Sequence, residues 1–134
     1  MIELLELSQV LKAVERTGTE VRYYDKECST SQDAGWYELS ANVDRLVICP
    51  NNQLNHSDLF DTIRHEAIHV VQACKGKPVL SRDYYTKNAP QGIKDRVFSD
   101  YPEHHRHHEL EAFMGAEYLS EGQIINLINK WCFE

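Results

Sequence analysis

The chain has 134 residues, of which 42% are hydrophobic and 26% are charged. This is an ordinary globular composition, and so short a chain predicts a single domain over residues 1–134. Fourteen Lys and Arg residues against 21 Asp and Glu residues give a net charge of −7, which argues against nucleic acid as a partner because sequence-independent binding requires the neutralisation of phosphates. No apolar run approaches the roughly 20 residues of a membrane-spanning helix, so we expect no membrane partner.

The cysteines bear on the cellular location. The first residues lack the basic start and sustained apolar run of a secretory signal, which predicts a cytoplasmic protein. None of the four cysteines forms a C-x-x-C pair, which excludes a zinc ribbon. Their even number would allow two disulfides in a secreted protein, but for a cytoplasmic one we expect reduced, mostly buried thiols. These residues are Cys28, Cys49, Cys74 and Cys132.

The first half of the chain predicts a helix followed by a small sheet. Leucines and valines at helical spacing predict a helix over residues 4–16, which Gly18 ends. Short apolar and aromatic runs then predict strands over residues 21–24, 36–39 and 45–49, with a polar loop before the second strand. Pro50 and the following asparagines end the sheet.

The second half predicts three helices and a long loop. A helix is expected over residues 57–74, capped by Ser57 and ended by Gly76. Residues 77–100 have weak periodicity and predict a long loop with one helical turn near residues 93–98. A helix over residues 102–119 follows, and a capping box at Ser120 opens the C-terminal helix. The predicted fold class is therefore α+β.

The sequence His65-Glu66-Ala67-Ile68-His69 lies in the middle of the second predicted helix. Residues four apart project from the same face of a helix, so the two imidazoles can bind one Zn²⁺ ion. Glu66 falls about 100° around the helix, from which it can reach a metal-bound water without binding the metal itself. This arrangement suits a general base.

A catalytic zinc usually takes three protein ligands and a water, so a third ligand must come from elsewhere. The position six residues after His69 is Lys75, which excludes a third histidine at that spacing. Glu109 is the best candidate, because Ala112 one turn later would let its helix approach the first helix closely. Glu111 is the alternative, but it lies about 200° further around the helix, so we expect only one of the two carboxylates to face inward.

The combination of His65-Glu66-x-x-His69 with Glu109-x-x-Ala112 resembles the signature of the gluzincin zinc metallopeptidases. The stretch Glu109-Leu110-Glu111-Ala112 is similar to the Glu-x-Glu-Ala stretch of the minigluzincins and the ImmA-like peptidases, and the resemblance covers residues 1–120. It implies a compact zincin-like core, with His65, His69 and Glu109 as zinc ligands and Glu66 as the catalytic residue. It also implies a protein or peptide substrate lying along residues 45–49, the last strand before the zinc helix.

One residue departs from that family pattern. Many gluzincins carry an aspartate or asparagine after the Glu-x-x-Ala stretch, where it orients a zinc histidine, and this chain has Phe113. The orienting partner must therefore come from another residue or be missing. This leaves an alternative function, a catalytically weak or inactive zinc-binding regulatory or interaction module on a peptidase frame. The presence of Glu66 favours the enzyme, because a module that only binds zinc needs no carboxylate there.

Several further residues are candidates for supporting roles. We interpret His104 and His107 as solvated, whereas His105 and His108 fall on the Glu109 side of their helix and are candidates for a transition-state stabiliser or an alternative ligand. Asp61 either orients His65 or lies exposed in the first turn.

A short chain offers few subsites, so a protein adaptor or regulator is a candidate partner. The sequence leaves the cleavage specificity and the oligomeric state open. Three tyrosines could donate to an oxyanion, but packing is the commoner role of each and none is assigned as catalytic; they are Tyr84, Tyr85 and Tyr101.

Overall fold

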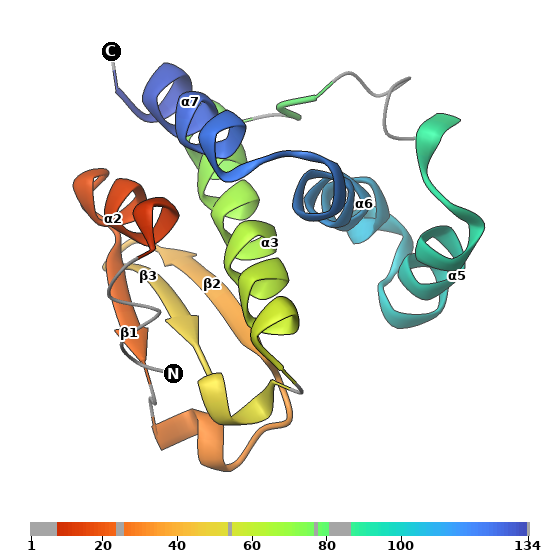
Figure 1. Ribbon diagram of the computed structural model, residues 1–134, viewed down its shortest axis with the longest axis horizontal. Coiled ribbons are helices and arrows are strands. Elements are labelled where there is room, and N and C mark those ends of the chain that lie inside the picture. Colours follow the sequence, from red (N-terminus) through yellow and green to blue (C-terminus); the bar gives the residue numbers. More distant parts are fainter. Residues whose placement is uncertain (1–7, 24–25, 54, 77, 81–86, 134) are drawn as a thin grey trace.

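The computed structural model describes residues 8–23, 26–53, 55–76, 78–80 and 87–133. A helix and a three-stranded sheet come first and four helices follow (Figure 1), so the predicted α+β class is confirmed. The elements are α2 (Gln9–Arg16), β1 (Glu20–Tyr23), the 3₁₀ turn η1 (Lys26–Ser29), β2 (Gly35–Ser40), β3 (Val43–Ile48), the 3₁₀ turn η2 (Pro50–Asn52), α3 (His56–Lys75), α5 (Gln91–Asp100), α6 (Glu103–Tyr118) and α7 (Glu121–Cys132). The start of the predicted first helix, together with Tyr84 and Tyr85, lies outside the described residues.

The sheet has the strand order β1-β3-β2. β1 pairs with β3 in parallel, and β2 pairs with β3 in antiparallel register. Residues 45–48 therefore have a hydrogen-bonded neighbour on each side, namely residues 20–23 and residues 35–38. A substrate cannot add to a strand whose two edges are occupied, so the expected substrate path along residues 45–49 is wrong.

Helix α3 is the central element, and its ends follow local rules. The side chain of Asn55 accepts from the backbone N–H of Asp58 at 2.9 Å, so the cap lies two residues before the predicted Ser57. Gly76 ends the helix in the left-handed region at φ 76°, as expected for glycine after the last turn. The capping box predicted at Ser120 opens α7 and is confirmed.

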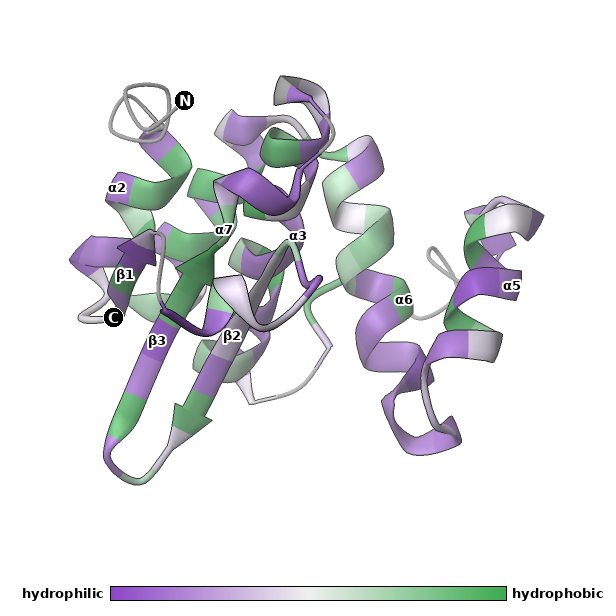
Figure 2. Cartoon of the chain, turned by 90° about the horizontal axis from the view of Figure 1, so that it is seen from below, coloured by the Kyte–Doolittle hydropathy of each residue, from purple (hydrophilic) through white to green (hydrophobic). Residues whose placement is uncertain are grey.

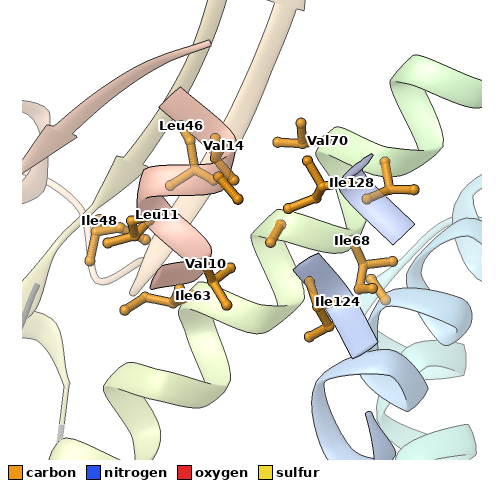
Figure 3. Packing of buried hydrophobic residues seen from close by; sticks show 14 of the residues in the cluster. Val10, Leu11, Val14, Leu46, Ile48, Ile63, Ile68, Val70, Ile124 and Ile128 are labelled. Atoms are coloured by element: carbon orange, nitrogen blue, oxygen red, sulfur yellow. The ribbon is translucent and has the colours of Figure 1, made fainter. Parts of the chain in front are cut away.

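The main core forms where α2, α7 and the sheet meet α3 (Figure 3). Each element contributes fully buried aliphatic side chains: Val10, Leu11, Val14, Leu46, Ile48, Ile63, Ile68, Ile124 and Ile128. On another side, α6 packs closely against α3, because a Cβ atom on Gly115 would lie only 2.7 Å from Cγ1 of Ile68. This close approach brings the first half of α6 beside the middle of α3.

The region predicted as a long loop contains a ten-residue helix, α5, rather than a single turn. The predicted helical segment was too short because α5 buries few side chains and therefore shows only a weak apolar periodicity. Val97 packs with Leu110 and Met114 of α6 in a second, smaller cluster. Figure 2 shows that the first half of α6 is hydrophilic and its second half more apolar.

Two disulfides connect the cysteines, Cys28–Cys49 and Cys74–Cys132. The expectation of reduced thiols is therefore wrong. The sequence alone could not reveal the pairing, because the partners are separated by 21 and 58 residues and meet only in the folded chain. Since such cross-links are rare in the cytosol, cysteine chemistry no longer supports a cytoplasmic location. None of the described helices is long and apolar enough to cross a bilayer.

Candidate metal centre

Helix α3 places the two motif histidines one turn apart, with ring centroids separated by 4.9 Å. Together with Glu66 they form a group in which one ligand atom from each residue lies within 4.8 Å of the others, close enough to hold a metal ion. His69 and Glu66 are buried, and His65 is nearly so. The helical repeat alone explains why these three side chains gather.

Glu109 reaches the two imidazoles from α6. Its Oε2 lies 3.1 Å from Nε2 of His65, and its Oε1 lies 2.9 Å from Nε2 of His69. The carboxylate therefore bridges the two nitrogen atoms that would face a metal. The structure brings Glu109 to the place where the sequence expects a third ligand, although its coordination of a metal stays a prediction.

The ionisation of these groups follows from burial and from mutual attraction. Burial by itself would raise the pKa of Glu109, but hydrogen bonds with His65 and His69 outweigh it and hold that pKa well below its usual value. Burial lowers the pKa of His65. For His69, burial is outweighed by the hydrogen bond with Glu109 and the charge of Glu66, so its pKa is raised. The site thus favours an ionised carboxylate in contact with imidazole nitrogen.

Glu66 differs from Glu109 because it is compensated only weakly, by Nε2 of His69 at 3.9 Å from its Oε1. Its Oε2 is buried and has no hydrogen-bond partner among the described residues. Burial raises the pKa of Glu66 to about 8, and the nearby carboxylates of Glu109 and Asp33 add to the effect. An oxygen atom that is buried without a partner is costly, and it fits a site where a further polar group, such as a metal-bound water, completes the contacts.

Glu111 is buried as well, with 1% of its surface exposed. Its carboxylate accepts from the backbone N–H groups of Val79 and Leu80, the shortest contact being 2.8 Å, and from Nε2 of Gln72 at 2.9 Å. These donors occupy both of its oxygen atoms. Of the two carboxylates, only that of Glu109 meets the imidazole nitrogens, as expected, although Glu111 is buried as well.

A family model described as "Domain of unknown function (DUF8637)" matches residues 2–133, nearly the whole chain. The chain belongs to this family. No curated protein and no solved structure matches it. Because the family description assigns no activity, the chemistry has to be inferred from the site itself.

Gln72 is the site residue that sequence reasoning missed. Its Oε1 lies 2.8 Å from Nδ1 of His69, and the whole residue is only 4% exposed. The signal that could have found it is its spacing, because a residue three positions after His69 lies on the same side of the helix. His108, one of the candidates on α6, also approaches this nitrogen, with its Nε2 at 3.1 Å and its ring stacked on that of His69.

The remaining candidates are either exposed or paired with another residue. His104 and His105 are exposed, with ring centroids 4.1 Å apart, and His107 is exposed. Asp61 pairs with Arg64, whose Nε also donates to the carbonyl oxygen of Ala116 at 2.9 Å. The ion pair gives Asp61 a partner other than His65.

Phe113 occupies the position where the family pattern expects a polar orienting group. Its ring packs edge-on against His65 with a centroid distance of 4.4 Å, and the guanidinium carbon of Arg96 lies 4.9 Å from the centroid of the Phe113 ring. Tyr101 also lies near Phe113, at 6.3 Å between ring centroids, and burial raises its pKa to about 12. An apolar wall therefore restricts the His65 ring.

Proposed function

We propose that this protein is a small zinc-dependent peptidase that uses the centre formed by α3 and α6. One observation carries the proposal: both Nε2 atoms of the histidine pair meet the carboxylate of Glu109, and the unpartnered Oε2 of Glu66 lies buried beside them. Two imidazoles and one carboxylate are a donor set typical of catalytic zinc sites. His65, His69 and Glu109 would hold the ion.

A bound zinc ion would supply Lewis acidity, polarising the scissile carbonyl and lowering the pKa of a water molecule. Glu66 is the residue of the chain that takes up the proton at its carboxylate. The positive charge of a bound ion would favour the ionised form that can take up this proton, and burial favours holding the proton until the leaving amine accepts it. Glu109, which stays ionised, keeps its negative charge available for the metal.

The substrate is proposed to be a peptide in extended conformation, lying along the outer edge of β2. Within the described sheet, β2 is an edge strand that pairs only with β3. Its first residue lies against α3, since a Cβ atom on Gly35 would be 3.0 Å from Cγ2 of Thr62, one turn before Glu66. Addition of a strand to such an edge supplies main-chain hydrogen bonds without requiring deep side-chain pockets.

The first test measures zinc content and hydrolysis together. We expect one zinc ion per chain and cleavage of unfolded protein or mixed peptides, with Glu66→Gln keeping the metal but losing hydrolysis. Glu109→Ala is expected to lose zinc, whereas Glu111→Ala should lose stability first, because its carboxylate binds backbone groups and no imidazole. Hydrolysis by Glu66→Gln at the parent rate would exclude the general-base role.

A binding module on the same frame is the alternative, favoured by Phe113 in place of a polar orienting residue. It predicts that the parent protein binds zinc but cleaves nothing in a proteome-wide peptide assay, and that Glu66→Gln changes neither property. The two disulfides favour work in an oxidising compartment for either function. A protein adaptor or regulator remains a proposed partner.

A further inference from the structure

The side-chain amide of Gln72 has one possible orientation in its surroundings. Its Nε2 lies 3.0 Å from the carbonyl oxygen of His108 and 2.9 Å from Oε1 of Glu111. A backbone carbonyl can only accept a hydrogen bond, so the NH₂ group has to face it. The amide oxygen of Gln72 must then face Nδ1 of His69, at 2.8 Å.

This orientation determines which nitrogen of His69 carries the proton. An amide oxygen can only accept, so Nδ1 of His69 donates to it. In the metal-free chain Nε2 also donates, to the carboxylate of Glu109, whereas the neutral ring that would bind zinc keeps its proton on Nδ1 and has its lone pair on Nε2. The contacts run from the carbonyl oxygen of His108, through the amide of Gln72, to Nδ1 of His69, which is the ring nitrogen that would not bind zinc.

We propose that Gln72 is a positioning residue that holds His69 in the zinc-binding tautomer and ring orientation, and that Glu111 holds Gln72 in turn. The inference rests on the proposed zinc centre and deepens it. Glu111 is suited to this role because its carboxylate is fixed by Val79 and Leu80. Outer partners of metal-binding histidines orient the ring and raise its basicity. Gln72 thereby supplies such a partner for His69, whereas His65 packs against Phe113.

His108 is the competing partner for Nδ1 of His69, and the geometry favours Gln72. The contact with His108 is longer, at 3.1 Å against 2.8 Å. His108 is exposed, whereas Gln72 is 4% exposed and has all three of its amide contacts within the protein. A buried acceptor with no competing water holds a ring more firmly than an exposed one.

The test compares Gln72→Met with a matched glutamine variant, Gln53→Met. The amide of Gln53 also donates to two carbonyl oxygens, those of Ala34 and Cys49, and accepts from the hydroxyl of Thr62. Both substitutions keep the side-chain length and remove the same number of contacts. We expect Gln72→Met to weaken zinc binding about 10–100-fold, measured by competition with a chromophoric chelator. Gln53→Met should lower the melting temperature by a similar amount but change the zinc affinity less than threefold.

A spectroscopic readout separates positioning from general stability. In the zinc-loaded parent protein, the Nδ1–H of His69 should give a sharp, slowly exchanging signal in ¹H–¹⁵N spectra, and Gln72→Met should broaden it by exchange with water. His108→Phe keeps a stacked ring and should leave both affinity and signal near those of the parent. If His108→Phe loses affinity and Gln72→Met does not, the proposal is overturned.

The outcome also separates this inference from the proposed function. If the parent binds zinc and Gln72→Met binds it equally tightly, only the role of Gln72 falls. If the parent binds zinc, Gln72→Met loses affinity as expected, and no peptide is cleaved, then the positioning role of Gln72 is supported and the peptidase function is overturned. If the parent binds no zinc, both are overturned.

Discussion

Three buried or nearly buried glutamates on α3 and α6 carry different chemistry because of what their oxygen atoms meet. Glu109 meets two imidazole nitrogens, and its pKa is lowered. Glu111 meets backbone N–H groups and an amide. Glu66 has an oxygen atom with no partner among the described residues, and burial raises its pKa to about 8. The surroundings, rather than the residue type, thus separate a candidate ligand, a structural anchor and a candidate base.

The raised pKa of Glu66 predicts a pH-dependent stability in the metal-free protein. The folded chain binds a proton at Glu66 up to about pH 8, whereas the unfolded chain releases it near the ordinary value of 4.5. The favourable contribution is therefore complete below pH 4.5 and is lost as the pH rises to about 8. Glu66→Gln cannot ionise and does not lose this contribution. As the pH rises over this range, we therefore expect its free energy of unfolding to increase relative to that of the parent, by up to about 1.4 kcal/mol per pH unit.

Urea unfolding in the presence of a chelator, at intervals from pH 5 to pH 8, measures this difference. Glu117→Gln is the control, because Glu117 is an exposed glutamate on α6. Its offset from the parent should stay constant over the same range. A constant offset for Glu66→Gln as well would show that Glu66 is ionised throughout and would contradict the effect of burial.

At the scale of elements, the site depends on how closely α6 approaches α3. The sequence suggested Ala112 as the small residue that permits this approach, and Ala112 is fully buried. The tightest contact, however, is at Gly115, where an added Cβ would lie 2.7 and 2.9 Å from the Cγ1 and Cδ1 atoms of Ile68. Ile68 lies between His65 and His69 in α3, so the spacing of the two helices there sets how far Glu109 reaches.

We therefore expect Gly115→Ala to push α6 away from α3. The cost should be about 1–3 kcal/mol in free energy of unfolding, typical of overpacking in a core, together with weaker zinc binding. The second substitution Ile68→Val, which removes the crowding Cδ1 atom, should recover part of both losses. Urea unfolding and chelator competition measure the two quantities.

Gly92→Ala is the matched control within a helix. Nothing lies within 4 Å of a Cβ atom at Gly92, and alanine has the higher helix propensity by about 1 kcal/mol. This variant should be neutral or more stable and should bind zinc as the parent does. If Gly115→Ala behaves in the same way, the close contact does not control the distance between α3 and α6.

At the scale of the whole molecule, the two disulfides fasten two different parts of the fold. Cys74–Cys132 joins the last turn of α3 to the end of α7, and Cys28–Cys49 joins η1 to the residue after β3. The second cross-link acts together with Asn52, whose side-chain amide donates to the carbonyl oxygens of Cys28, Ser31 and Asp33. The Cys28–Cys49 disulfide and the Asn52 side chain thus both hold the irregular segment before β2, next to the proposed substrate edge.

Loss of either disulfide should destabilise the protein by an amount that follows the length of the loop. Chain-entropy reasoning gives about 4 kcal/mol for the 58-residue separation of Cys74–Cys132 and about 3 kcal/mol for the 21-residue separation of Cys28–Cys49. Paired Cys→Ser variants measured by urea unfolding test this order. Protein prepared without reductant should show no reactive thiols when unfolded; four thiols per chain would contradict the pairing.

The sequence by itself determined the features that depend on neighbouring residues. The turn of a helix places His65, Glu66 and His69 together, and the cap at Ser120 and the stop at Gly76 act within a few positions along the chain. The α+β class followed from the same local periodicities. Even here Asn55 capped α3 in place of Ser57, because two residues that favour the cap position lie two positions apart.

Only the tertiary structure decided which distant residues meet. Nothing local shows that Glu111 is buried against Val79 and Leu80, that Gln72 contacts His69, or that β3 is central in the sheet. The cysteine pairs are likewise contacts across long separations. Helical and strand periodicity fixes the face on which a side chain lies, but the partner on that face depends on how whole elements pack together.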